Sequence, residues 1–460
     1  MIQYENIEKA MGVEIAMSSD MRNAIYKWDQ MYRNKSPWIG KGVKGLNLPA
    51  AVASEIARLV TMEAGIKISG SSTADMINES LNGWFLQNLP RNVEYACATG
   101  GVVFKPYNEN GRIKIDVAKS GYFYPVSFDS SGEITACIFP EFKRKGKKLY
   151  TRLEYHEFEN GMYRIENRAF VSRKAIVRTD NIINLGQEIK LGDIPEWEEL
   201  APYVEFHNAV CPLFSYFKIP TANNIDPESP LGVSVYSRAV DQIQDADEQY
   251  GATIWEFRSK ETAVQAADEF FRKTKKGEPI IPKGQERVYR AMGPGIKSNN
   301  GAPFFNVYSP EIRDESFYRG YNRIVQKVEF NSGLAYGTLS DPQNVDKTAE
   351  EIKASKQRSY ASVKSIQNSL GNSIKNLANA MMAWCAIGEI APFGQIDVSC
   401  AWDDSLIVDK KYETEQLRAD LSVGAVGLIE YRMKRFNETK EQAIKMLKLA
   451  SEFDLDAVEE

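Results

Sequence analysis

Residues 230–258, PLGVSVYSRAVDQIQDADEQYGATIWEFR, and residues 309–332, SPEIRDESFYRGYNRIVQKVEFNS, are the two stretches that decide the fold of this chain. In the first stretch, apolar residues recur at steps of three and four positions from Val235 to Phe257. That spacing is typical of one face of an α-helix, so we predict a helix over the whole first stretch. A helix of about 25 residues is roughly 38 Å long.

The second stretch begins with a helix-start signal. Ser309 supplies a capping hydroxyl, Pro310 suits the first helical position, and Glu311 is an early acid. We expect this helix to continue to about Asn331. The segment between the two helices contains three β-rich runs, which predicts a small mixed unit joining them. An elongated hairpin of this kind cannot bury its own apolar faces and needs neighbours to cover them. The three runs are residues 262–267, 287–291 and 304–308.

The N-terminal part is predicted to change from helix to strand. Residues 1 to about 90 show helical apolar spacing, whereas residues 100–173 consist of short β-rich runs separated by turn residues. The pairs Asn110-Gly111 and Asn160-Gly161 favour tight hairpin turns, so we expect one antiparallel meander. Residues 174–230 are rich in proline, which indicates an irregular segment.

The C-terminal part is predicted to contain a loop, the longest helix, a strand and a helical tail. Residues 333–346 should be a loop, because glycine, proline and asparagine break the helical pattern there. A helix is predicted over 346–384 and a strand over 396–401. Helices are also expected at 412–421, 428–436 and 441–453, the last behind a capping box of Thr439 and Gln442. The second half of the longest helix carries an apolar stripe of Val363, Ile366, Leu370, Ile374, Leu377 and Met381.

The fold class is therefore α+β, built from several parts, and the composition agrees with that. The chain has 460 residues, 43% of them apolar, which suits several folded modules. Its net charge of −5 gives no global positive field for holding nucleic acid, so any contact with DNA must be local. The five scattered cysteines suit reduced thiols. Without a signal-peptide pattern or a long apolar span, we expect a soluble protein made in a cytoplasm.

Patterns for metal or nucleotide binding are weak. The two histidines, His156 and His207, are too few for a paired-histidine metal motif, and a structural role is the better interpretation. Residues 40–45, GKGVKG, match a dinucleotide-binding pattern only formally, because no strand–helix–strand unit surrounds them. No Walker A motif is present, which argues against an ATP-driven motor.

An acidic group on the first long helix leaves one catalytic alternative open. Asp241, Asp245, Asp247 and Glu248 could hold magnesium in a nuclease if they converged on a site. Carboxylates on one amphipathic helix are more often its solvated face, and we favour that interpretation.

The order of these parts, together with several short strings, resembles the portal proteins of tailed bacteriophages, and most closely those of long-tailed phages of Gram-positive hosts. The resemblance covers nearly the whole chain. The strings are residues 98–101 leading into 104–107, 230–232 before the first long helix, 308–313 and 320–322 in the second, 333–338, and 347–352 at the start of the longest helix.

The resemblance implies a non-enzymatic ring subunit, typically one of twelve, at one vertex of the capsid. It implies a wing over residues 1–229, a stem of two helices over 230–258 and 309–332, and a clip over 259–308. A tunnel loop would follow at 333–346, then a long wing helix and strand over 347–400, and a helical crown over 401–460. No cofactor is implied.

The implied partners are double-stranded DNA bound without sequence specificity, the terminase large subunit, the major capsid and scaffolding proteins, and the head-tail adaptor, with no membrane. The ring would assemble in the bacterial cytoplasm and remain in the virion. DNA-channel candidates are Gly337, Asn344, Lys347, Lys353, Lys356 and Lys364. Channel-lining acids would be Asp241, Asp245 and Glu248, and the clip interface would use Lys273, Lys275 and Lys276.

Two rival functions stay open from the sequence. One is another structural phage head protein, such as a minor capsid or adaptor protein. The other is a metal-dependent nucleic-acid enzyme using the acidic group. The order of stem, clip and stem argues against the first, and the absence of a P-loop or a convincing metal motif argues against the second.

Overall fold

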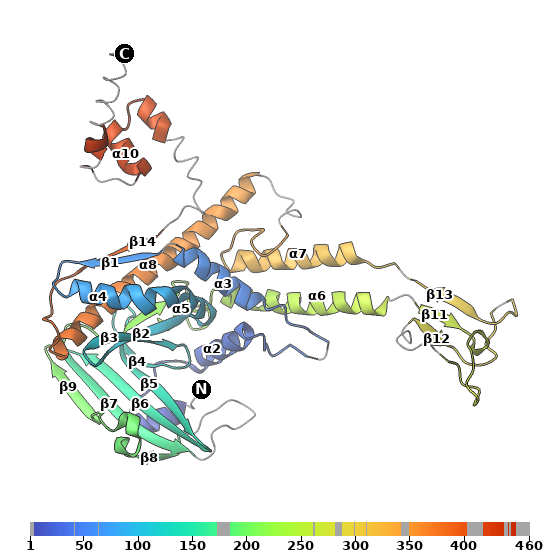
Figure 1. Cartoon of the computed structure of the whole chain (residues 1–460), viewed down its shortest axis with the longest axis horizontal. Helices are drawn as coiled ribbons and strands as arrows, with labels where there is room; N and C mark the ends of the chain where they lie inside the picture. The colour runs from blue at the N-terminus through green and yellow to red at the C-terminus, as the bar shows by residue number, and fades with distance from the viewer. Residues whose placement is uncertain are drawn as a thin grey trace. The chain divides into compact units, whose positions relative to one another are not determined.

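A computed structural model of the chain describes residues 4–40, 42–62, 64–172, 185–260, 263–280, 288–298, 300–309, 311–341, 349–402, 417–436, 440 and 443–447 (Figure 1). The chain divides into two compact units, Met1–Ala401 and Trp402–Glu460. All five cysteines lie in the first unit and are free thiols, as expected.

The strands between residues 101 and 218 form two antiparallel sheets, so the prediction of one continuous meander was wrong. Strands β2 (Gly101–Glu109) and β3 (Arg112–Lys119) pair with each other, and β10 (Ser215–Lys218) pairs with the other edge of β2. The next strands form a separate six-stranded sheet in the order β4-β5-β6-β7-β8, with β9 also on β7. Their bounds are Tyr124–Phe128, Ile134–Lys145, Lys148–Glu159, Met162–Ser172, Gln187–Ile189 and Tyr203–His207.

The predicted hairpin turns are confirmed. Asn110 and Gly111, and likewise Asn160 and Gly161, have positive φ at both positions, as a two-residue hairpin turn requires. The split between the sheets follows β3, where the chain turns at residues 120–123 before β4 begins. The pairing of β10 with β2 joins segments more than one hundred residues apart, so local periodicity could not reveal it.

The N-terminal helices pack around these sheets. They are α1 (Tyr4–Met11), α2 (Ser19–Tyr32), α3 (Leu48–Thr61), α4 (Ala74–Ser80) and α5 (Leu86–Thr99), with a π-helical turn over Leu81–Phe85. The prediction that residues 1–90 are helical missed β1 (Gly65–Ser69). That strand pairs antiparallel with β14 (Asp397–Ala401), and β14 confirms the strand expected there.

The long helix α8 (Ala349–Ile387) packs against β2, β10 and α3 of the first unit (Figure 1). Every member of its predicted apolar stripe is buried, from Val363 to Met381. Ser215 of β10 donates a hydrogen bond of 2.7 Å from its hydroxyl to the carbonyl of Ser373, which joins α8 to the three-stranded sheet.

The helix predicted from residue 230 begins later than expected. A short 3-10 turn, Ser237–Ala239, leads into α6 (Val240–Ser259). Residues 231–236 are instead buried and bonded to the end of α5, since Val235 donates its N–H to the carbonyl of Cys97 at 2.9 Å. Gly232 and Gly100 come so close that a Cβ on either would lie 2.2 Å from the other's carbonyl oxygen. The apolar spacing continues through residues 231–236, but backbone groups of this segment bond to α5 and not within a helix.

The second predicted helix also begins later, as α7 (Asp314–Asn331), and it runs beside α6 (Figure 1). The three predicted strands between the two helices are confirmed as β11 (Ala263–Ala266), β12 (Tyr289–Ala291) and β13 (Phe305–Tyr308), in the order β12-β11-β13. A 3-10 turn, Asp268–Phe270, follows β11. We call residues 263–308 of this region the end unit.

The second unit contains α10 (Leu428–Phe436), which confirms the helix expected there. Residues 417–422 are also helical, in agreement with the end of the helix expected at 412–421. Helical residues 443–447 fall within the last predicted helix. Its capping residues Thr439 and Gln442 lie outside the described residues.

The buried stripe of α8 predicts a stability effect. Replacing Leu377, which is fully buried, with alanine should destabilise the first unit by about 2–5 kcal/mol, because a cavity replaces lost contacts. Thermal unfolding of the full chain would measure this. Lys375→Ala, at an exposed position of the same helix, is the matched control. Equal melting temperatures for both variants would contradict the assignment of Leu377 to the core.

Candidate functional site: the α6–α7 pair and the loop after it

The end of the α6–α7 pair next to the end unit is joined by charged side chains. Glu256 of α6 accepts two hydrogen bonds of 3.0 Å from the guanidinium of Arg313, the residue that precedes α7. Lys260 lies 3.3 Å from the same carboxylate and donates to the carbonyl of Glu311 at 2.9 Å. The hydrogen bonds from Arg313 lower the pKa of Glu256 to about 2, with Lys260 adding to the shift. This end therefore depends on a charged contact more than on an apolar core.

The opposite end of the pair is packed into the body. Gln242 accepts a hydrogen bond of 2.9 Å from the side-chain amide of Asn331. Ala246 and Val325 are buried against each other and against Leu48, with Leu339 packed on the same cluster. The pair is thus anchored by apolar contacts at one end only.

Asp247 differs from the other acids of α6. It is buried, and it accepts hydrogen bonds from the indole N–H of Trp38 at 2.8 Å and from the backbone N–H of Leu46 at 2.7 Å. Burial raises the pKa of Asp247, against the lowering effect of these two bonds. The carboxylate therefore fastens the segment before α3 onto α6.

The three predicted channel-lining acids lie apart from Asp247. Asp241, Asp245 and Glu248 are all exposed, and Glu248 accepts a hydrogen bond of 2.8 Å from Gln244. Within the described residues, no group of three or more His, Cys, Asp or Glu side chains is arranged to hold a metal ion. The predicted solvated face of α6 is confirmed for these three residues.

The loop after α7 is folded back onto that helix. Glu329 is fully buried, and its carboxylate accepts hydrogen bonds from the backbone N–H groups of Leu339 at 2.6 Å, Ser340 at 2.8 Å and Gly337 at 3.3 Å. The hydroxyl of Ser340 donates to the same carboxylate at 2.8 Å. Gly337, a predicted channel residue, therefore lies in an anchored part of the loop. Asn344 and Lys347 lie outside the described residues.

The structure describes the side chains of two of the predicted lysines of α8. Lys356 is exposed and Lys364 is half-buried, and both lie on the N-terminal half of the helix. Lys353 belongs to the same helix, but its side chain lies outside the described residues. Lys356 and Lys364 thus lie on one helix next to the loop, and their contact with DNA stays a prediction.

Two arginines near these lysines escaped the sequence analysis. Arg358 lies over the ring of Phe330 at 4.2 Å, and Arg238 lines the same cavity of about 430 Å³ between the end of α7, α8 and residues 220–238. Arg358 is two residues from Lys356 and therefore lies on a different face of α8, so it was not included when the lysines were grouped by helical face. The cation–π contact with Phe330 depends on the antiparallel return of the chain, which no local pattern contains.

The predicted interface lysines of the end unit are all exposed. Lys275 and Lys276 lie inside a tight turn that the N–H of Gly277 closes by donating to the carbonyl of Thr274 at 2.9 Å, and Lys273 precedes this turn in an isolated β-bridge with Pro279. Near them, the rings of Phe270 and Phe305 lie 5.5 Å apart and are both largely exposed. The end unit therefore presents basic and aromatic side chains together.

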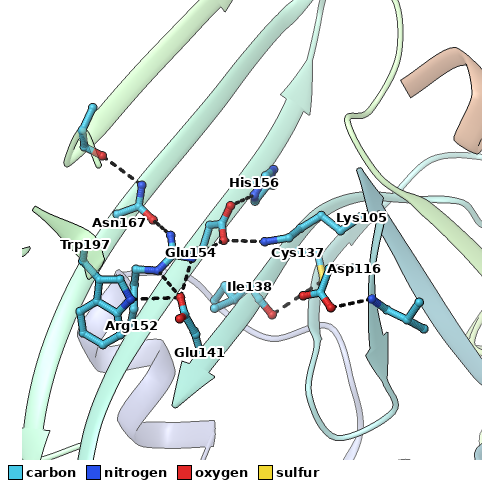
Figure 2. A network of polar contacts seen from close by, with 12 residues as sticks. Lys105, Asp116, Cys137, Ile138, Glu141, Arg152, Glu154, His156, Asn167 and Trp197 are labelled. Atoms are coloured by element: carbon cyan, nitrogen blue, oxygen red, sulfur yellow. Dashed lines mark hydrogen bonds and ion pairs between the residues drawn. The ribbon is translucent and has the colours of Figure 1, made fainter. Parts of the chain in front are cut away.

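A second polar network connects the six-stranded sheet to Lys105 of β2 in the three-stranded sheet (Figure 2). Glu154 accepts from Lys105 at 2.6 Å and from His156 at 2.8 Å, and it lies 3.1 Å from Arg152. Burial alone would raise the pKa of Glu154, but Lys105, His156 and Arg152 together lower it well below its usual range. Burial lowers the pKa of His156, against the raising effect of Glu154. The histidine is thus structural, as predicted, whereas His207 is exposed.

This network extends through Arg152, which donates to Glu141 at 3.0 Å and to Asn167 at 2.7 Å. It borders a cleft of about 370 Å³ that is lined by both cations and carboxylates. The sequence did carry a signal, because residues 152, 154 and 156 lie at every second position of one strand and so share a face. Every charge in the network has a partner in this chain, which fits a role in fixing the sheet.

Among the described residues, no helix is both long enough and apolar enough to cross a bilayer.

Comparison with known proteins decides the family. Residues 45–448 match the family described as phage portal protein, SPP1 Gp6-like. The chain belongs to the phage portal protein family. No curated protein matches it. Among solved structures, it is similar to a chain of "Neck of native GTA particle computed with C12 symmetry", with 10% identity, a TM-score of 0.46, and coverage of 93% of this chain and 97% of that one. A chain of "Virion of native gene transfer agent (GTA) particle" has 9% identity and a TM-score of 0.45, with coverage of 94% and 99%.

The family match confirms the resemblance stated from the sequence. This portal subunit is a structural protein and not an enzyme, and its fold is of the α+β class. The two rival functions, another head protein and a metal-dependent enzyme, are thereby set aside.

The contact between Glu256 and Arg313 predicts a pH dependence. The pKa of Glu256 lies at about 2 in the folded chain against an ordinary value of 4.5. The contact is therefore fully stabilising above pH 4.5 and is lost as the pH falls toward 2. Arg313→Gln should speed amide exchange at the end of α6 and the start of α7 near neutral pH, and the difference from the native chain should vanish near pH 2.

The matched control for this experiment is Arg319→Gln, at an exposed position of α7. Exchange rates corrected for intrinsic pH effects would be compared for the three proteins. A difference between Arg313→Gln and the native chain that persists unchanged at the lowest pH would show that the carboxylate of Glu256 is not the group involved.

Proposed function

We propose that twelve copies of this portal subunit form a ring around a channel through which double-stranded DNA passes without sequence specificity. The observation that carries this proposal is the exposed apolar surface of the α6–α7 pair. Trp255 is 69% exposed and Tyr318 is 56% exposed, on the part of the pair that has no apolar core of its own. Burying a large aromatic side chain is worth about 2 kcal/mol or more, so neighbouring copies that cover these residues would stabilise the assembly.

The proposed place of the ring is one vertex of the capsid, as part of the virion, after assembly in the bacterial cytoplasm. There it would serve DNA packaging, retention and ejection. In this arrangement α6 and α7 are the stem, the end unit is the clip, and residues 333–346 are the tunnel loop. The major capsid and scaffolding proteins are the proposed partners of the wing, which comprises residues 1–229 and 347–400, with the crown at 401–460.

The charges of the described residues suit a channel that lets DNA slide. Asp241, Asp245 and Glu248 form an exposed acidic face on α6, which would repel phosphate groups where it borders the channel. Lys356 and Lys364, together with Lys347 and Lys353, would offer weak contacts to phosphate near the loop. A net charge of −5 agrees with transient contacts in place of tight binding.

Ring formation can be tested with one substitution. Purified full-length chain should give rings with a central hole in negative-stain electron microscopy, and monomers or closed shells would contradict the proposal. Trp255→Ser should reduce the ring fraction strongly, because losing a large aromatic anchor at an interface costs on the order of 2 kcal/mol per contact. Tyr203→Ser, at an exposed aromatic of β9, is the control and should assemble normally. Normal assembly of Trp255→Ser would show that sister copies do not cover that side chain.

The proposed docking of the terminase large subunit and the head-tail adaptor involves the exposed basic turn of the end unit. Reversing the charges of Lys273, Lys275 and Lys276 to glutamate should weaken binding of the adaptor or motor by tenfold or more (about 1.4 kcal/mol per factor of ten) and leave ring formation intact. Co-sedimentation of rings with each partner would measure this. The control reverses three exposed lysines of the body, namely Lys67, Lys148 and Lys375. Equal binding by both triple variants would remove this turn from the interface.

A further inference from the structure

The loop after α7 has one buried acceptor at its centre. The carboxylate of Glu329 receives three backbone N–H groups and one hydroxyl, all from residues 337–340. Because the side chain is fully buried, water does not replace these donors. The fold of the loop and the burial of this carboxylate therefore depend on each other.

Other contacts hold the same loop along the same helix. The side-chain oxygen of Asn322 accepts the N–H of Asp341 at 2.8 Å, and Leu339 packs on the cluster that contains Val325. The ring of Tyr336 stacks on that of Phe330, with centroids 6.4 Å apart.

These contacts show the direction in which the loop runs. As the loop goes forward from residue 336 to 341, its partners on α7 go backward from 330 to 322. Asn322 and Glu329 are seven residues apart, about two helical turns or roughly 10 Å, and so lie on one face of the helix. The described part of the loop is thus an arm laid antiparallel along α7.

We propose that Glu329 is the positioning residue of this arm. Its two oxygens are the acceptors that three backbone N–H groups of the arm share, and an arm in another place would leave the carboxylate buried without donors. This inference deepens the proposed function and rests on it in one respect. If the loop borders the DNA channel, Glu329 gives every copy in the ring the same arm position and thereby sets the width of the opening.

Replacement of Glu329 by glutamine tests the proposal with little change of shape. The glutamine keeps one acceptor oxygen and turns an NH2 group toward the donors of the arm, and the remaining oxygen no longer belongs to a carboxylate. Either Gly337, which keeps only the Ser340 hydroxyl as an acceptor, or both Leu339 and Ser340 lose the oxygen that accepts their N–H groups. Hydrogen exchange would be followed by mass spectrometry on assembled full-length rings. Amides of Gly337, Leu339 and Ser340 should exchange at least about tenfold faster, as expected when a hydrogen bond to a charged group is lost.

The matched control is Glu315→Gln, an exposed carboxylate on the same helix, which should leave exchange in the arm unchanged. Exchange in α5 and in the buried half of α8 should stay the same in both variants. Unchanged exchange in the arm of Glu329→Gln would overturn the proposal. A uniform rise over the whole chain would overturn it as well, because that result describes general destabilisation.

A second variant covers the case in which Glu329→Gln does not fold. Ser340→Ala removes the hydroxyl, which donates to the carboxylate at 2.8 Å and also accepts the N–H of Gly337 at 3.1 Å, and leaves the three N–H groups in place. Faster exchange at Leu339 and Asp341, whose acceptors the substitution does not remove, would support the proposal, and unchanged exchange at both would overturn it. Deleting residues 337–344 is less informative, because it removes all four donors and leaves the buried carboxylate of Glu329 without them.

DNA packaging separates this inference from the proposed function. Particles built with Glu329→Gln should contain fewer full-length genomes than particles built with Glu315→Gln, as measured by nuclease-protected DNA. Faster exchange in the arm together with normal packaging would keep Glu329 as the positioning residue and overturn the role of the loop in the channel. Exchange in the arm of Glu329→Gln that is no faster than in the native chain, together with impaired packaging, would overturn the positioning role of Glu329 and leave the channel proposal standing.

Discussion

The α6–α7 pair has an apolar core at only one end, and this constraint shapes much of the molecule. Near the body, Ala246 and Val325 are buried with Leu48. Near the end unit, the two helices are joined by Glu256, Arg313 and Lys260, while Trp255 and Tyr318 face solvent. An ion pair near solvent contributes little free energy, because water and salt compete with it. The distal half of the pair therefore suits a subunit whose stability is completed by neighbours.

Carboxylates divide into two groups along these helices. Asp247 and Glu329 are buried and accept backbone or indole N–H groups from segments that cross the helix. Asp241 and Asp245 point to solvent on another face of α6. The sequence shows the same residue types in both groups, since Asp247 stands two positions after Asp245. Only the segments that return to the helix, from residues 38–46 and 337–340, decide which acid is buried.

The parts predicted well from the sequence have local causes. The stripe of α8, the two Asn-Gly turns and the strands of the end unit each follow from periodicity or from the φ angles that glycine and asparagine tolerate. The errors have long-range causes. The pairing of β1 with β14 joins segments more than three hundred residues apart. In residues 231–236, which were predicted to be helical, Val235 donates its N–H to the carbonyl of Cys97, far away in the sequence. The channel candidates Gly337 and Lys356 were chosen from a break in the helical pattern and from a shared helical face, and both remain predictions. Glu329 and Arg358 were missed because their partners lie across a chain reversal.

Burying a carboxylate costs desolvation free energy, but its hydrogen bonds select one conformation of the loop over others. Apolar contacts such as that of Leu339 tolerate small shifts, because dispersion and the hydrophobic effect have little directional preference. The oxygens of Glu329 accept donors only in a narrow range of directions, so a shifted arm loses several hydrogen bonds at once. Polar groups of this kind can specify one conformation even where an apolar replacement would be equally stable. In the proposed ring, small differences between copies would make the opening irregular if the arm borders it, so a single conformation of the arm would matter more than its stability.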